Sequence, residues 1–182
     1  MKSKQFTTLN GRVIRMVVAS ALALGSGFAG VDSYAAGSAS SSIAVSATVN
    51  PNCLISAGAL GFNTYDPVSA NATLPLDSSA TLTVTCTQGA VAKIMLAQGA
   101  NPGPGSNDGS PVRRMLSGTN YLSYQLYKDA AGGVVWGNTD GTHVAYTGTG
   151  GSGSVSVYGR VAAGQNVPAG SYTDTVLATI NF

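Results

Sequence analysis

Apolar residues alternate with small or polar residues at both ends of the exported part of this sequence. Residues 42–49 and residues 172–182 each follow the period of two that is typical of a β-strand. The apolar positions are Ile43, Val45, Ala47 and Val49 in the first segment, and Val176, Ala178, Ile180 and Phe182 in the second. We expect a sandwich that ends on such a strand to lack a partner at that edge, and a neighbouring copy to donate its detached N-terminal strand there. The pattern predicts a polymer subunit.

The first residues have the features of a secretion signal. Four basic residues precede an apolar run over residues 16–24, and small residues follow around residues 33–36. The run is short and is followed by several glycines, so export is favoured over a retained membrane anchor. We therefore expect residues 1–36 to be a signal peptide, residues 37–50 to carry the donor strand and residues 51–182 to form one domain.

Removal of the signal peptide changes the charge of the chain. Four of the nine basic residues and one of the seven acidic residues lie in residues 1–36, which leaves five basic and six acidic residues. The only basic cluster in the remainder is Arg113-Arg114. A nucleic-acid-binding protein would carry a basic surface, so this class is excluded.

The composition predicts an all-β domain. The sequence contains no glutamate, few long charged residues that favour exposed helices, and many Gly, Ser, Thr, Ala and Val residues. Short period-two segments separated by turn residues predict a β-sandwich. The expected strands are 53–56, 60–63, 80–87, 91–98, 114–116, 121–127, 134–136, 154–161 and 172–182.

The two cysteines, Cys53 and Cys86, both lie in the exported part. A pair of cysteines in an oxidising compartment predicts a structural disulfide, worth about 4 kcal/mol for a loop of this length. A zinc site would need two further ligands, and His143 is the single histidine. We therefore expect no metal.

Two matches to G-x-G-x-x-G do not indicate a nucleotide site. One lies in the signal peptide, and the other, residues 148–153, precedes a strand-like segment where the motif requires a helix. A hairpin loop is the favoured interpretation of residues 148–153, and no cofactor is expected. His143 has no nucleophile motif to serve and sits in a turn-like context, as do most of the aspartates. We expect no enzymatic activity.

Aromatic residues leave one ligand-binding alternative open. Several tyrosines together with Trp136 could form a sugar platform, provided that Trp136, which follows a loop, is exposed. Core and cross-strand packing explains most of these residues. The alternative is a secreted carbohydrate-binding module.

A set of short motifs resembles a known family. Residues 60–67 contain an F-x-x-Y-D signature after the first cysteine, and residues 82–87 surround the second. Residues 114–116, 122–127 and 135–137 follow, and residues 168–176 end in G-x-Y-x-D-x-V. In this order they are similar to the spore coat protein U domain, the subunit family of Csu-type archaic chaperone-usher pili.

This resemblance implies an incomplete immunoglobulin-like β-sandwich of about six strands, completed by the N-terminal strand of a neighbouring subunit. It implies a pilus subunit that supports surface attachment and biofilm formation, with itself, a periplasmic chaperone, an outer-membrane usher and a tip adhesin as partners. The protein would pass through the periplasm to an extracellular fimbrium. A spore-coat or other surface structural protein of the same fold is the second interpretation.

Overall fold

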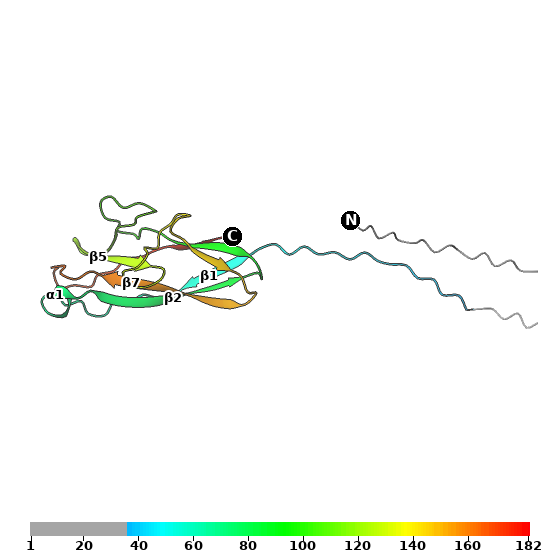
Figure 1. Ribbon diagram of the computed structural model, residues 1–182, viewed down its shortest axis with the longest axis horizontal. Coiled ribbons are helices and arrows are strands. Elements are labelled where there is room, and N and C mark those ends of the chain that lie inside the picture. Colours follow the sequence, from blue (N-terminus) through cyan, green and yellow to red (C-terminus); the bar gives the residue numbers. More distant parts are fainter. Residues whose placement is uncertain (1–35) are drawn as a thin grey trace, which may run out of the picture. The chain divides into compact units, whose positions relative to one another are not determined.

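The structure is a computed structural model that describes residues 36–182 (Figure 1). The expected signal peptide, residues 1–36, lies outside the described residues except for Ala36. The chain divides into two units, Met1–Val45 and Ser46–Phe182, and all the helices and strands of the described part belong to the second. Residues 36–52 form neither a helix nor a strand.

The described part of the chain contains eight strands and one short helix. In chain order these are β1 (Cys53–Ala57), α1 (Ala70–Thr73), β2 (Leu76–Cys86), β3 (Val91–Leu96), β4 (Arg113–Ser117), β5 (Asn120–Tyr127), β6 (Val144–Thr147), β7 (Ser152–Val161) and β8 (Ala178–Asn181). They form a five-stranded antiparallel sheet with the order β1-β2-β7-β5-β4 and a three-stranded antiparallel sheet with the order β6-β3-β8.

The core lies between the two sheets, and the alternation of side chains along each strand builds it. In β2 the inward residues Leu82 and Val84 are buried, whereas the threonines between and beside them point outward. In β3 the inward residues Ala92, Ile94 and Leu96 cover them from the other sheet. This arrangement confirms the predicted all-β sandwich, because period-two alternation buries one face of each sheet.

The predicted disulfide between Cys53 and Cys86 is present. These residues are direct partners in the β1–β2 register, so the bond joins the first residue of β1 to the last residue of β2. The sulfurs are buried with the core cluster. Both cysteines are bonded, and the described residues include no cluster of potential metal ligands.

Trp136 is buried, which contradicts the exposure that the carbohydrate-binding alternative required. Its side chain is 0 % exposed, and its indole Nε1 donates a 2.9 Å hydrogen bond to the Ile94 carbonyl. Trp136 lies in the core although it follows a loop, because its backbone amide continues the pairing with β5 through a 2.9 Å hydrogen bond to the Leu126 carbonyl. Trp136 therefore fills the core and offers no sugar platform.

Several strand predictions differ from the structure at segments that face the sandwich edge. Residues 60–63 and 134–136 lack continuous pairing, apart from an isolated bridge between Tyr127 and Val135. Strand pairing in the C-terminal segment is confined to β8, after a bridge at Thr173. Residues 148–151 connect β6 and β7, which belong to different sheets, and residues 152–153 begin β7, so the connection is a crossover rather than a hairpin. Pairing partners, which apolar alternation does not specify, decide these cases.

Candidate functional site: an open groove between the sheets

A groove of about 950 Å³ opens between the two sheets of the domain. Its floor is apolar and comes from both layers of the core. The floor residues are Leu82, Leu96, Leu122, Leu126, Val157 and Val161. These residues are themselves buried, at 0–5 % exposure, so the groove is a space above the core in which a further strand could lie.

One side of the groove is formed by residues 57–65, here called the first wall. Leu60 and Phe62 lie directly over Gly159 of β7, where even a Cβ atom would come within 2.7 Å of the Phe62 ring. The Phe62 ring also packs edge-to-face on Tyr124, with 6.0 Å between the centroids. The glycine at position 159 is thus required for the first wall to approach the sheet this closely.

Tyr65 fixes the far end of the first wall. Its hydroxyl donates a 2.9 Å hydrogen bond to the Ala162 carbonyl and accepts one of 2.9 Å from the Gln165 amide. The next residue, Asp66, accepts hydrogen bonds from the amides of Val68 and Ser69, the local Asx pattern that favours a turn. The F-x-x-Y-D signature therefore builds this wall.

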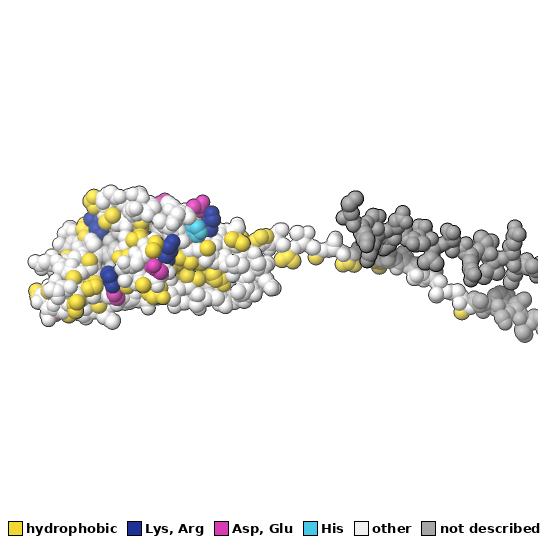
Figure 2. Space-filling view, viewed as in Figure 1, with side chains coloured by type: hydrophobic (Ala, Val, Ile, Leu, Met, Phe, Trp, Pro, Cys, Tyr) yellow, Lys and Arg dark blue, Asp and Glu magenta, His cyan; other side chains and the backbone are white. Residues whose placement is uncertain are grey.

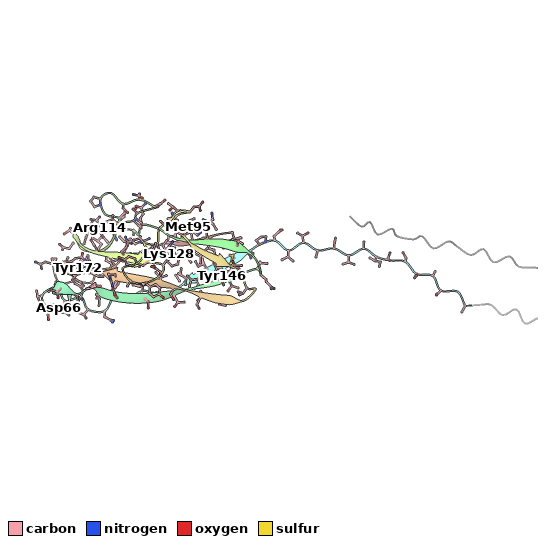
Figure 3. All side chains as sticks on the ribbon, viewed as in Figure 1. Asp66, Met95, Arg114, Lys128, Tyr146 and Tyr172 are labelled. Atoms are coloured by element: carbon pink, nitrogen blue, oxygen red, sulfur yellow. A yellow bond between two sulfur atoms is a disulfide. The ribbon has the colours of Figure 1, made fainter. Side chains whose placement is uncertain are left out.

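The other side of the groove is formed by residues 172–178, here called the second wall. Thr173 exchanges backbone hydrogen bonds of 2.8 and 3.1 Å with Leu116 of β4, in the five-stranded sheet. Four residues later, Leu177 accepts a 2.9 Å bond from Ala97, and β8 then pairs with β3 in the three-stranded sheet. The second wall thus crosses from one sheet to the other. Figure 3 shows Tyr172 toward the same end of the domain as Asp66, with Tyr146 toward the opposite end.

A polar network holds the second wall to the domain. The Asp174 carboxylate accepts hydrogen bonds from the Tyr124 hydroxyl at 2.7 Å, the Ala100 amide at 2.9 Å and the Asn101 side chain at 3.0 Å. Burial, followed by the hydrogen bond to Asp174, raises the pKa of Tyr124 above its ordinary value. The phenol therefore stays protonated and remains a donor.

Arg113 lies beside this network in the core. Its side chain is 1 % exposed and donates to the carbonyls of Leu96, Ala97 and Trp136 at 2.8–2.9 Å, and to the Gln125 side chain at 2.6 Å. Burial lowers the pKa of Arg113 to about 10, against the opposing effect of Tyr124 and Asp174. The guanidinium therefore joins the edge strand β4 to the end of β3 in the core.

The four residues expected to act as a donor strand are all exposed. Ile43, Val45 and Val49 are 87 %, 90 % and 79 % exposed, and Ala47 is exposed as well. Figure 2 shows hydrophobic side chains at the surface along the described part of this segment. Their assignment as donor residues stays a prediction.

The four residues expected at the groove-edge strand have different positions. Ala178 and Ile180 lie in β8, opposite Leu96 and Ile94 of β3, and pack on the core. Val176 precedes β8 and lines the groove, whereas Phe182 follows β8 and is 56 % exposed. Within the described residues, β8 pairs with β3 alone, so its other edge is unpaired, and its first residue, Ala178, lines the groove.

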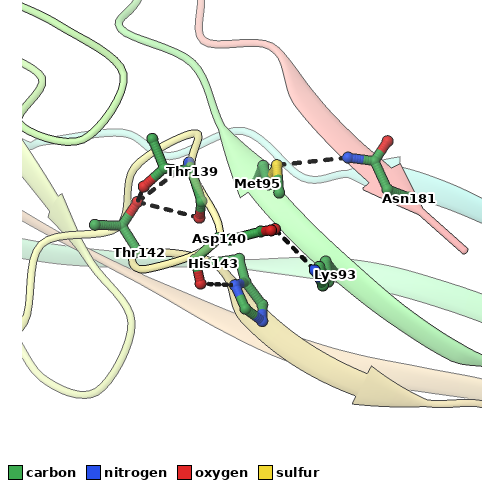
Figure 4. Close-up of polar contacts among 7 residues, drawn as sticks. All are labelled: Lys93, Met95, Thr139, Asp140, Thr142, His143 and Asn181. Atoms are coloured by element: carbon green, nitrogen blue, oxygen red, sulfur yellow. Dashed lines mark hydrogen bonds and ion pairs between the residues drawn. The ribbon is translucent and has the colours of Figure 1, made fainter.

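The residues considered for catalysis form local structural contacts. His143 makes a 2.6 Å contact through Nδ1 to the Asp140 carbonyl of its own turn, and Lys93 pairs with the Asp140 carboxylate at 2.8 Å (Figure 4). Asp129 accepts from the amides of Ala130 and Val134 in the turn after β5, as its turn context predicts. Asp129 and Asp140 are thus explained by turn geometry and surface pairing.

Sequence reasoning missed the side chains that hold the two walls. Phe62, Tyr65 and Asp174 were noted as parts of motifs, without a structural role, and Tyr124 as one of several tyrosines. The sequence did contain a signal for these side chains, because the F-x-x-Y-D and G-x-Y-x-D-x-V motifs overlap the segments that form the two walls. Their partners, Gly159 and Ala100, are far away in the sequence and could not be identified from it.

Comparisons with known proteins identify the fold and the relatives of the chain. The model of the Spore Coat Protein U domain family matches residues 39–179. "Protein U" of Myxococcus xanthus is 44 % identical over 155 residues, which cover 81 % of this chain and 87 % of that protein. No helix among the described residues has the length and apolar character needed to span a membrane.

A solved structure has the same fold. It is the CsuC-CsuE chaperone-tip adhesion subunit pre-assembly complex from archaic chaperone-usher Csu pili of Acinetobacter baumannii, with a TM-score of 0.53 and 23 % identity. The match covers 74 % of this chain and 40 % of the solved chain, so this chain corresponds to less than half of that protein. The similarity confirms the expected incomplete immunoglobulin-like sandwich.

Proposed function

Because the chain belongs to the Spore Coat Protein U domain family, as its motifs predict, we propose that it is a structural subunit of an extracellular chaperone-usher pilus. In this proposal the subunits polymerise by donor-strand complementation, and the fibre supports surface attachment and biofilm formation. The family is one of structural proteins rather than enzymes, in agreement with the expected lack of catalysis.

The observation that carries the proposal is the match between the groove and an exposed segment of the same chain. The groove has an apolar floor and an unpaired strand edge beside it, which is an aggregation hazard if nothing covers it. Residues 43–49 offer apolar side chains at every second position, the spacing that a strand between the two walls requires. Among the described residues, the groove lacks a strand to cover it, and residues 43–49 lack a strand to pair with.

A donor strand from a second copy would bury enough apolar surface to hold subunits together. Ile43, Val45 and Val49 contribute about 1.5–3 kcal/mol each when fully buried, or roughly 5–9 kcal/mol before ordering costs. Strand pairing would have to break along the whole donor at once, so dissociation should be slow. We expect fibres that resist mild denaturant far longer than a single subunit does.

The open groove also accounts for the other proposed partners. A periplasmic chaperone would cover the groove until an outer-membrane usher exchanges the chaperone for the donor strand of the next subunit. A tip adhesin would end the fibre. The proposed location is therefore the cell surface, reached through the periplasm, and the uncovered groove is the reason that assembly needs an escort.

The test compares mature full-length chains that differ in the donor segment. The variant Ile43→Asp/Val45→Asp places charges on the apolar face, and Ala44→Asp/Ser46→Asp places the same charges on the opposite face as the control. Size-exclusion chromatography should show multimers for the wild type and the control, and no multimers for the first variant. A synthetic peptide of residues 41–50 should then stabilise the first variant against urea. Equal multimers from all three chains would contradict the proposal.

A second candidate is a spore-coat protein, which the description of the family and the similarity to "Protein U" favour. The same donor-strand chemistry could build a coat layer instead of a fibre. Electron microscopy of cells that express the chain with its neighbouring genes separates the two, since a pilus gives thin filaments and a coat gives a continuous layer.

A further inference from the structure

The second wall contains a short stretch between its two points of attachment. Thr173 is paired with β4 in one sheet, and Leu177 is bonded to the end of β3 in the other. Between them, Thr175 and Val176 make no backbone hydrogen bond to another described residue. This stretch borders the groove, so its free amide and carbonyl groups are available to an incoming strand.

One side chain determines where this stretch lies. The half-buried Asp174 uses both carboxylate oxygens, with two bonds on Oδ1 from the 100–101 turn and one on Oδ2 from Tyr124. The partners come from two different elements, β5 and the loop after β3. A single carboxylate therefore ties the stretch to both sides of the sandwich.

The surrounding backbone is fitted to this carboxylate. Gly99 adopts a φ of +91°, and a Cβ atom built there would overlap with the Asp174 carboxylate. Only glycine leaves room for the carboxylate and also adopts this φ readily. The loop after β3 is thus shaped around Asp174, rather than Asp174 being an incidental surface charge.

We propose that Asp174 is a positioning residue for the donor strand, which holds Thr175 and Val176 in an extended conformation ready to pair with it. This inference rests on the proposed function. Without the tie, the stretch would be free in the open subunit and fixed only after the donor has bound. The ordering cost would then fall on the binding step and weaken it.

The expected effect of losing the Asp174 contacts depends on whether the residue pre-orders the second wall or has a purely structural role. A tie that matters equally in the open and the occupied subunit lowers the stability of both and leaves donor affinity unchanged. Loss of a tie that orders the wall in advance lowers donor affinity, because it destabilises the occupied subunit and the open subunit by different amounts. Donor affinity and urea stability therefore have to be measured on the same variants.

The experiment uses the full mature chain with Ile43→Asp/Val45→Asp, which leaves the groove intact, and a fluorescent peptide of residues 41–50 as the probe. Asp174→Ala should weaken peptide binding about tenfold to a hundredfold, since Thr175 and Val176 would then have to be ordered at the binding step. Asp174→Asn keeps an acceptor oxygen and should bind more tightly than Asp174→Ala. Asp140→Ala removes a carboxylate that pairs with Lys93 away from the groove, and should bind like the parent chain.

Tyr124→Phe is the second variant, because it removes only the bond to Oδ2 and retains the ring in the core. It should weaken peptide binding by a smaller factor than Asp174→Ala does. If Asp174→Ala fails to fold, Tyr124→Phe alone tests the inference. Wild-type peptide affinity in Tyr124→Phe and in any folded Asp174→Ala would overturn the inference and leave the proposed function standing. A parent chain that binds no peptide at all would overturn the proposed function itself.

Discussion

The two alternating segments, residues 42–49 and residues 172–182, have the same sequence pattern and opposite environments. Ile180 in β8 lies opposite Ile94 and packs on the core, whereas Ile43 and Val45 are 87 % and 90 % exposed. The difference is the availability of a partner, since β3 pairs with the C-terminal segment and the described chain contains no pairing for the N-terminal one. Alternation thus specifies that a segment can form a strand, and the rest of the chain decides whether it does.

The largest effect should come from the disulfide, which secures the first strand after the exposed segment. Replacing Cys53 and Cys86 with serine should lower the free energy of unfolding by about 4 kcal/mol, because the 33-residue loop gains freedom in the unfolded chain. Urea denaturation followed by tryptophan fluorescence measures the loss, since Trp136 is buried only in the folded state. An unchanged midpoint would show that β1 is held by its pairing alone.

A matched pair of variants tests directly whether the two segments differ in their contribution to subunit stability. Ile180→Ala should cost the subunit about 2 kcal/mol, because a partly buried side chain leaves the core. Val45→Ala should change the urea midpoint of the subunit very little when it is measured at a concentration too low for assembly, because the residue is exposed there. The same Val45→Ala change should shorten the lifetime of multimers in mild denaturant. Similar losses of subunit stability from both changes would erase the difference between the segments.

The first wall should show a smaller effect. Tyr65→Phe removes the hydroxyl that bonds to Ala162 and Gln165, at a cost of about 1 kcal/mol in unfolding free energy. Tyr158→Phe alters a hydroxyl for which the structure gives no hydrogen bond, and it serves as the control. Equal stability of the two variants would indicate that packing of Leu60 and Phe62 alone holds the wall.

The smallest effect should be a pH dependence at the outer face of the five-stranded sheet. A bidentate pairing with Arg160, at 2.6 and 2.7 Å, holds the pKa of Asp77 below its ordinary value. A carboxylate with a lowered folded-state pKa stabilises the fold above its unfolded-state value near 3.8, and this contribution disappears as the pH falls through the folded-state pKa. Asp77→Asn should therefore reduce stability by less than about 1 kcal/mol at pH 7 and by a smaller amount at pH 2. Urea titrations at both pH values measure this, and an equal loss at both would rule out the ion pair as the cause.

Much of the fold follows from local patterns in the sequence. Strands β2, β3, β5 and β7 were predicted within a few residues, because long alternating segments bury one face. The helix α1 and the strand β6 were missed, because an element of four residues is too short to show a hydrophobic period in the sequence. The bond between Cys53 and Cys86 was predicted from the expectation that the chain is exported, because two cysteines in an oxidising compartment usually pair.

The groove could be predicted only in outline. The alternating termini indicated an open edge, but its walls depend on contacts between distant residues such as Phe62 with Gly159 and Asp174 with Ala100. Residues 60–63 and 172–176 have strand-like patterns, and yet they line a space without continuous ladder pairing. The position of Trp136 was left open for a similar reason, because its burial depends on a carbonyl of β3.

The position of the disulfide has a mechanical consequence for a fibre. If a neighbour holds residues 43–49, a pulling force enters the domain after only Asn50, Pro51 and Asn52, and reaches Cys53 at the first residue of β1. The covalent bond to Cys86 passes this load directly to β2, which is flanked by strands on both sides. Tension on this linker therefore cannot unzip β1 from its first residue, because the load is shared with the interior of the five-stranded sheet from the start.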